Sequence, residues 1–192
     1  MFWSLIFLDL FESSLVMLSN LNQSFFLFLF LSFSVLSQGN TDGTSKEDRS
    51  LITTPEIIEV NLEVIHPPEG FQVSPSFNGF IHYQASSAII VNLIKKVNYR
   101  KLTDGMNQEF YDKNKLEYIS EKKIISDNGT KGIWYKFNFN IEGSAYGRYM
   151  VYAGDLNKTL WLNITYPLKL EDLIESQLLD CMQTIDLTKI KK

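Results

Sequence analysis

The side chains that could perform acid–base or nucleophilic chemistry are few and widely separated. The chain has two histidines, His66 and His82, and one cysteine, Cys181. A catalytic thiolate needs a base within reach, and nothing in the sequence places either histidine near Cys181. The cysteine lies in the apolar helical pattern LLDCMQTI, which favours a buried side chain. A single cysteine also rules out an intrachain disulfide.

Metal binding and carboxylate catalysis have no clear signal either. His66 precedes two prolines, which is typical of a loop, and the chain lacks a spaced cluster of ligands. Asp104, Glu109 and Asp112 are typical of the solvated face of a helix. We therefore expect no metal, no cofactor and no enzymatic activity. A hydrolase that uses paired carboxylates on loops remains an alternative.

Trp134 and Trp161 are the best candidates for ligand or partner contact. Each stands in a strand pattern and alternates with apolar residues, so we expect both to point away from the apolar side. The polar residues in the same phase are Lys136, Asn138, Asn140, Asn163 and Thr165. Aromatic and amide groups together suit carbohydrate, peptide or protein contact, so Trp134, Lys136, Asn138, Trp161 and Asn163 form the predicted surface. Alternatively, the helix predicted over 99–114 covers this face and buries both tryptophans.

Turn signals and alternating apolar residues predict the strands that position these residues. A first strand is expected over 57–65, ended by HPPEG, and a tight hairpin around Asn78-Gly79 within 71–84. AIIVNLI, residues 88–94, is typical of a central strand. Tyr99, Leu102, Met106 and Phe110 form one helical stripe over 99–114. Further strands are expected over 116–126, 133–141, 146–153 and 159–166, with short turns that force antiparallel pairing.

The periodicity changes at Tyr166-Pro167. Up to Tyr166 every second residue is apolar, and from Lys169 the apolar spacing becomes three and four. The predicted helix carries Leu170, Leu173, Ile174, Leu178, Met182 and Ile185 on one stripe, which is too apolar to face water. We therefore expect an α+β fold, in which helices pack on a single antiparallel sheet.

The order of these elements resembles the PsbP-like fold, an α/β/α sandwich. The stretches that carry the resemblance span Phe71 to Ile185 and are GFQVSPS, AIIVNLI, SDNGTKGIWYKFNF, YMVYAGDLNKTLWLNITYP and LIESQLLDCMQTI. This superfamily includes photosystem II extrinsic proteins, a Ran-binding nuclear import factor and exported bacterial proteins of the DcrB-like group. No manganese, calcium or Ran-contact motif is matched here. The resemblance therefore implies an exported bacterial member of this superfamily.

The N-terminal region, residues 1–37, resembles a signal peptide. Phe25 to Leu36 has the length of a signal-peptide apolar core, and VLSQ offers a cleavage site after Ser37. Met17 is a possible true start. No Lys or Arg precedes Lys46, so retention of residues 25–36 as a membrane anchor remains an alternative. Residues 38–55 are predicted to be a flexible linker, 56–187 the folded domain, and 188–192 a basic tail.

Charge argues against a nucleic-acid partner. The chain has 18 basic and 22 acidic residues, and two of the acids, Asp9 and Glu12, precede residue 38. The remaining net charge of −2 shows no excess of basic residues of the kind that binds a polyanion. We expect an exported, periplasmic or secreted, non-enzymatic binding or accessory domain that contacts a protein or small ligand in the cell envelope. The alternative is a membrane-anchored structural envelope protein, which contacts the membrane only through the uncleaved N-terminal segment.

Overall fold

The computed structural model describes residues 55–190. The predicted signal segment 1–37, the cleavage after Ser37, the possible start at Met17 and all but the last residue of the linker lie outside this range. The last two residues of the predicted basic tail lie outside it as well. The elements that the structure describes begin at Glu56 and end at Lys189.

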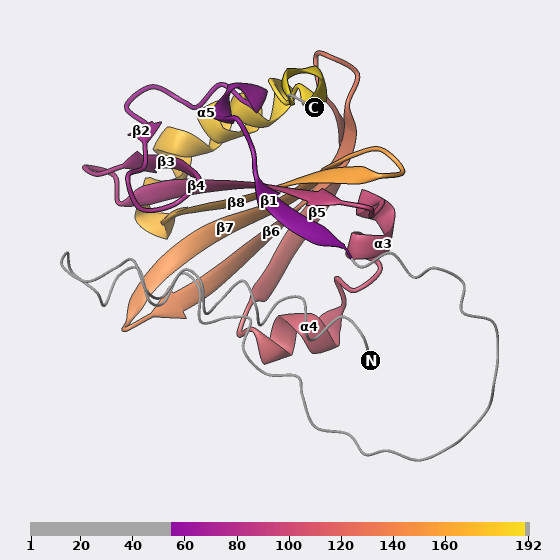
Figure 1. Ribbon diagram of the computed structural model, residues 1–192. Helices are drawn as coiled ribbons and strands as arrows, with labels where there is room; N and C mark the ends of the chain where they lie inside the picture. The colour runs from indigo at the N-terminus through magenta and orange to yellow at the C-terminus, as the bar shows by residue number, and fades with distance from the viewer. Residues whose placement is uncertain (1–54, 191–192) are drawn as a thin grey trace. The chain divides into compact units, whose positions relative to one another are not determined.

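An eight-stranded sheet in which every pairing is antiparallel forms the centre of this domain (Figure 1). The order of the strands along the sheet is β2-β3-β4-β8-β7-β6-β5, and β1 also pairs with β4. The strands are β1 (Glu56–Glu59), β2 (Gln72–Val73), β3 (Gly79–His82), β4 (Ser87–Lys95), β5 (Glu117–Ile125), β6 (Lys131–Ile141), β7 (Ser144–Gly154) and β8 (Lys158–Pro167). The predicted antiparallel α+β architecture is therefore confirmed.

The first predicted strand is shorter than expected. β1 ends at Glu59, and Leu62–Val64 forms a 3-10 turn, η2. The Asn61 side chain accepts a hydrogen bond from the Glu63 N–H at 3.1 Å, which caps this turn. An asparagine side chain competes with strand pairing in this way, so the alternating pattern alone misassigned residues 60–65.

The predicted tight turn at Asn78-Gly79 is also wrong. Residues 74–78 connect β2 and β3, and the innermost pair of the two strands is Val73 with Phe80. β1 and β3 pair with different halves of the same edge of β4, and Asn78 lies between them. Its side-chain amide donates to the carbonyls of Val60 at 3.0 Å and Val91 at 2.7 Å. Asn78 thus links β4 to the segment after β1.

The last four strands form the predicted meander. The β6–β7 hairpin has a two-residue turn at Glu142-Gly143, where Ile141 pairs with Ser144. Both turn residues have positive φ, 48° and 82°, as a type I′ turn requires. The turn at Asp127 to Gly129 and the turn after Gly154 are likewise found where the sequence predicts them.

The helix predicted over 99–114 is broken into two short helices, α3 (Tyr99–Thr103) and α4 (Gln108–Lys113). The break includes Gly105, and the Asn107 side chain caps α4 by accepting from the Phe110 N–H at 3.0 Å. Glycine weakens a helix interior, and an asparagine N-cap favours a new start, so two helices form in place of one. They lie on the sheet face opposite the C-terminal helix (Figure 1).

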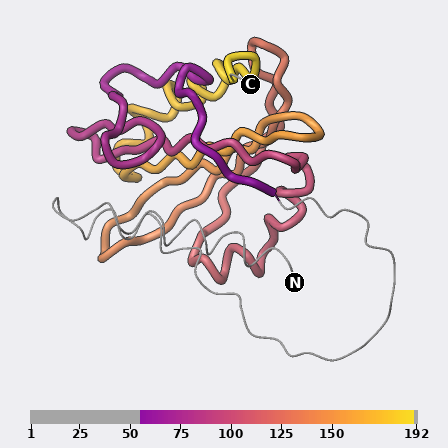
Figure 2. The backbone as a smooth tube through the Cα atoms, viewed as in Figure 1, coloured from indigo at the N-terminus to yellow at the C-terminus, as the bar shows by residue number. Residues whose placement is uncertain are grey.

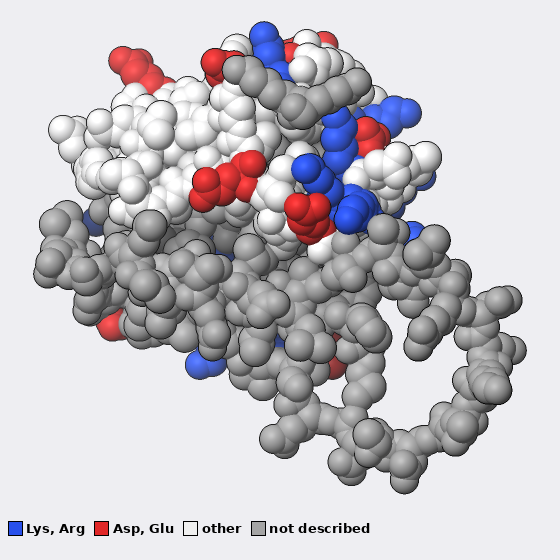
Figure 3. Space-filling view, in the orientation of Figure 1, with Lys and Arg blue, Asp and Glu red and all other residues white. Residues whose placement is uncertain are grey.

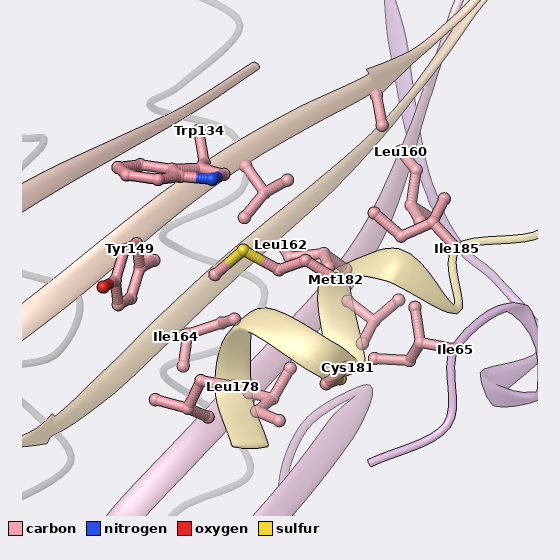
Figure 4. Close-up of a cluster of buried hydrophobic side chains, with 14 of the residues drawn as sticks. Ile65, Trp134, Tyr149, Leu160, Leu162, Ile164, Leu178, Cys181, Met182 and Ile185 are labelled. Carbon is pink, nitrogen blue, oxygen red and sulfur yellow. The ribbon is translucent and has the colours of Figure 1, made fainter. Parts of the chain in front are cut away.

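The C-terminal helix, α5 (Glu171–Gln183), follows a 3-10 turn, η3 (Leu168–Leu170), and lies across the sheet as predicted. Figure 4 shows its apolar side chains packed on those of β7 and β8. The helix residues Ile174, Leu178, Cys181 and Met182 are buried with Leu160, Leu162, Ile164 and Tyr166 of β8. Leu173 is 72% exposed, so its assignment to the buried stripe is wrong.

The chain after α5 returns to the segment before β2, as the backbone trace in Figure 2 shows. The Asp186 N–H donates to the Val64 carbonyl at 2.9 Å, and the His66 N–H donates to Thr184 Oγ1 at 2.8 Å. A last 3-10 turn, η4 (Leu187–Lys189), follows. Within residues 55–190, none of the helices combines the length and the apolar character needed to cross a bilayer.

Candidate functional site

The five residues of the predicted surface lie on opposite faces of the sheet. Val151 of β7 pairs with Trp134 of β6 on one side and with Leu162 of β8 on the other. Residues that are directly paired across antiparallel strands point to the same face, so Trp134 shares a face with Leu162. That face is covered by α5 and is called the α5 face. Trp161 is paired with Tyr152 and points to the other side.

The single aromatic surface expected from the sequence is therefore absent from residues 55–190. Trp134 is buried beneath α5, with its ring edge-on to Tyr149 at 5.3 Å. Lys136 and Asn138 lie on the α5 face too, whereas Trp161 and Asn163 lie on the opposite face. In β6 it is the mostly polar phase, with Trp134, Lys136 and Asn138, that faces α5, whereas the apolar phase, with Phe137, faces the other side. The rule that the apolar phase of a strand faces the packed helix therefore gave the wrong orientation for β6.

Lys136 belongs to a polar cluster at the start of α5. Its Nζ lies 2.6 Å from Oε1 of both Glu171 and Glu175. Tyr149 donates its hydroxyl to Glu175 at 2.6 Å, and Tyr166 donates to Glu171 at 2.9 Å. Both tyrosines come from the sheet and both glutamates from the first turns of α5. The cluster therefore fixes how the helix lies on the sheet.

These two carboxylates are the closest match to the hydrolase alternative. The Oε1 atoms of Glu171 and Glu175 both lie 2.6 Å from Lys136 Nζ, so the two carboxylates are close neighbours. A carboxylate pair of this kind needs one protonated acid. The hydrogen bond from Lys136 lowers the pKa of Glu175, helped by the hydrogen bond from Tyr149. The lowered pKa favours the ionised form of Glu175, so Glu175 is poorly suited to act as a general acid.

The other sheet face carries the least expected residue of the domain, Arg148 on β7. Its side chain is 0% exposed, and none of its three guanidinium nitrogens has a hydrogen-bond partner among the described residues. Its one described contact of note is with the ring of Phe139, at 4.2 Å from the guanidinium carbon. Burial lowers the pKa of Arg148 to about 10. Burying an arginine without a partner destabilises the folded state, so Arg148 is a candidate for a functional residue.

Two further buried polar side chains adjoin Arg148. Thr165 of β8 is paired with Arg148, and Asn163 is one alternation further along the same strand. Thr165 Oγ1 and Asn163 Oδ1 are buried without a hydrogen-bond partner in the described range. We call the sheet face that carries these three residues and Trp161 the Arg148 face.

Apolar side chains surround this polar group. Asn163 is paired with Met150 on one side and Ile90 on the other, and Thr165 is paired with Ala88. All three of these apolar residues are buried. On the same face, Tyr152 of β7 donates to Sδ of Met106, which lies between α3 and α4, at 3.8 Å. Tyr111 of α4 packs on Phe137, the residue of β6 that is paired with Arg148, at 5.1 Å between ring centroids.

Sequence reasoning overlooked Arg148, although a signal was present. The residue stands in AYGRYMVYA, where it is the one charged residue within a run of aromatic and apolar residues. A charge in the middle of a buried strand is rare and calls for a partner.

The other candidates from the sequence are accounted for by local structure. His82 accepts a hydrogen bond from the Ala85 N–H at 3.2 Å within its turn, and His66 is exposed. Cys181 is buried, as predicted, and burial raises the pKa of its thiol to about 12. Asp112 accepts from Gln108 on the exposed side of α4. The part of the chain that the structure describes contains no group of three residues arranged to hold a metal ion.

An open groove of ≈ 580 Å³ lies at one end of the sheet, between α3 and the β5–β6 and β7–β8 turns. Arg100, Lys131 and Lys158 line it. Figure 3 shows Lys and Arg side chains gathered on the right of the view, where α3 lies in Figure 1. Asp155, also in the groove, accepts from the N–H groups of Asn157 and Lys158 and thereby closes its own turn. None of the described residues that line the groove has a buried side-chain nitrogen or oxygen without a hydrogen-bond partner, in contrast to Arg148.

The domain is an α+β sandwich, with α5 on one face of an antiparallel sheet and α3 and α4 on the other. No protein-family model and no curated protein matches the chain.

Three solved structures are similar in fold. LpqN of Mycobacterium tuberculosis, described as involved in cell envelope biogenesis, is 12% identical, with a TM-score of 0.45 over 72% of this chain and 84% of that one. Cyanobacterial PsbP (CyanoP) from Synechocystis sp. PCC 6803 is 8% identical, with a TM-score of 0.46 over 73% and 96%. PA94, a protein of unknown function from Pseudomonas aeruginosa, is 11% identical, with a TM-score of 0.39 over 72% and 86%. These likenesses concern the fold alone.

Proposed function

We propose that this chain is an exported, non-enzymatic binding or accessory domain of the bacterial cell envelope, and that it binds through the Arg148 face. The observation that carries the proposal is the buried, unpaired guanidinium of Arg148 beside the unpaired polar atoms of Asn163 and Thr165. Perturbed ionisable groups gather at functional sites because such sites are organised for a ligand and not for stability. Neighbouring apolar residues are the usual lining of a binding site.

Export is the part of the proposal that depends on the N-terminal sequence. The apolar block Phe25 to Leu36 and the small residues before Gln38 are typical of a cleaved signal peptide. In the alternative, the same block is retained and anchors a structural protein in the membrane. Intact mass of the chain recovered from each cell fraction separates the two. A soluble envelope product that starts at Gln38 supports export, a full-length product in membranes supports the anchor, and a full-length cytosolic product contradicts both.

Binding is tested by the thermal unfolding midpoint of the chain after refolding from denaturant, which removes bound molecules. A ligand that binds only the folded state raises this midpoint. We expect bacterial envelope extract to raise it for the wild type and not for R148M, whereas cytosolic extract leaves both unchanged. An envelope extract that shifts neither protein, or shifts both equally, would contradict binding through the Arg148 face.

A further inference from the structure

The ligand class follows from the unmet requirements of the Arg148 face. The Arg148 guanidinium carries five N–H donors, and its nitrogens have no acceptor among residues 55–190. The only compensation that the structure describes is the Phe139 ring, and a cation–π contact replaces no hydrogen bond. A group of this geometry pairs best with a planar or tetrahedral oxyanion that accepts two parallel hydrogen bonds.

The position of Thr165 also favours an oxyanion as the ligand. Directly paired side chains of antiparallel strands lie about 4.5–5.5 Å apart at Cβ, so the Thr165 hydroxyl and the Arg148 guanidinium can reach one bound group. The hydroxyl is buried and unpaired, and it can donate a third hydrogen bond to the same oxyanion. Two neighbouring strands thus place donors on the same face of the sheet.

The surroundings of these donors are apolar. Ala88 and Ile90 of β4 and Met150 of β7 are buried on the same face, beside Thr165 and Asn163. A free inorganic anion would gain nothing from these neighbours and would lose its hydration. A hydrocarbon chain attached to the anion gains about 0.8 kcal/mol for each buried CH₂ group. Charge at one point and apolar area beside it together select an amphiphile.

We propose that the Arg148 face binds an amphipathic anion, with its carboxylate or phosphate on Arg148 and Thr165 and its hydrocarbon chain along β4 and β7. The inference rests on the proposed binding function and names its ligand class. A carboxylate would come from a fatty acid and a phosphate from a lipid headgroup, and both present the same oxyanion chemistry.

The test is a calorimetric titration of the refolded full chain with decanoate and, separately, decyl phosphate. Decanol keeps the hydrocarbon chain without the charge, and butyrate keeps the charge with little hydrocarbon. We expect one of the two anions to bind, and decanol and butyrate to bind at least tenfold more weakly. The tighter anion identifies the source. Equal binding of decanol and decanoate, or no binding by either anion, would overturn the proposal.

Three variants locate the site. R148M is expected to weaken anion binding at least tenfold, and T165V, which removes one donor and keeps the shape, to weaken it several-fold. R100M removes an exposed arginine of α3 and is the matched control that should bind like the wild type. Unchanged affinity in R148M would overturn the proposal. A stability loss in the variants D42N, E47Q or D48N, with no anion bound by the wild type, would also overturn it, because the chain itself would then supply the partner of Arg148.

The proposed function can survive failure of this inference. If no amphiphile binds, while envelope extract still raises the unfolding midpoint of the wild type and not of R148M, the ligand class is wrong and binding through the Arg148 face stands. If envelope extract has no effect either, the proposed function fails as well.

Discussion

Replacing Arg148 by methionine is expected to stabilise the unliganded chain, which is the reverse of the usual effect of a substitution in a buried strand. Burial lowers the pKa of Arg148 from its ordinary value to about 10, a shift of more than two pH units. At about 1.4 kcal/mol for each pH unit, keeping this side chain charged in the folded state costs about 3 kcal/mol. Methionine has a similar length and no charge, so it fills the same space without this cost.

The net gain is smaller than this cost because arginine also makes favourable contacts. The cation–π contact with Phe139 offsets about 0.5–2 kcal/mol. We therefore expect R148M to raise the free energy of unfolding at pH 7 by about 1–2.5 kcal/mol after this offset. Urea unfolding of refolded protein measures the change. R100M, on exposed α3, is the control and should lie within about 0.5 kcal/mol of the wild type.

The same argument fixes a pH dependence. The folded state of the wild type releases the Arg148 proton at a lower pH than the unfolded state does. The unfolded state therefore binds more protons in the window from pH about 10 up to the ordinary arginine pKa. The free energy of unfolding of the wild type therefore rises with pH through that window. The difference in this free energy between R148M and the wild type should begin to shrink as the pH passes 10. A variant that is less stable than the wild type at pH 7 would refute the reasoning, because it would show a partner that stabilises the charge.

Three further predictions concern α5 and its contacts. Leu178→Ala should lower the free energy of unfolding by about 2–5 kcal/mol in a urea titration, whereas Leu173→Ala, on the same helix but exposed, should change it by less than about 0.5 kcal/mol; equal effects would contradict the packing of α5 described here. Cys181, buried with a raised thiol pKa, should resist a thiol reagent in the native protein and react after unfolding; rapid reaction of the native protein would show an open core. The pKa of Glu175 is lowered mainly by Lys136, so its stabilisation is present above 4.5 and is lost as the pH falls through its folded pKa. The decrease in the free energy of unfolding on acidification should therefore be smaller in K136M than in the wild type, by up to about 1 kcal/mol. The same decrease in both proteins would show that the ion pair contributes nothing to stability.

Local pattern was enough to predict most of the elements. The meander and the C-terminal helix follow from alternation, turn residues and the change of period at Pro167, all of which act over a few residues. The errors occur where one polar side chain redirects the backbone: Asn61 ends the first strand, Asn78 joins two strands, and Asn107 starts a second helix. These hydrogen bonds compete with regular structure and leave no periodic signal.

The candidate site was less predictable because it depends on which residues are paired across strands. Trp134 and Trp161 both look exposed when each strand is considered alone, and only the pairing of Val151 with Trp134 and Leu162 separates them. A change of register by one residue reverses every side chain of a strand, and turn residues do not determine it across four strands. Arg148 was visible in the sequence as a charge in an apolar run, but its lack of a partner is a property of the folded chain.

The most direct test of the binding role of Arg148 is its own Nε–Hε signal in a proton–nitrogen correlation spectrum. The chain has three arginines, Arg49, Arg100 and Arg148, so the signal can be assigned by its loss in R148K. We predict that decanoate or decyl phosphate shifts this signal in a saturable manner and slows its exchange with water, while the Arg100 signal stays in place. An Arg148 signal that is unchanged at concentrations where either anion binds elsewhere on the chain would contradict the account.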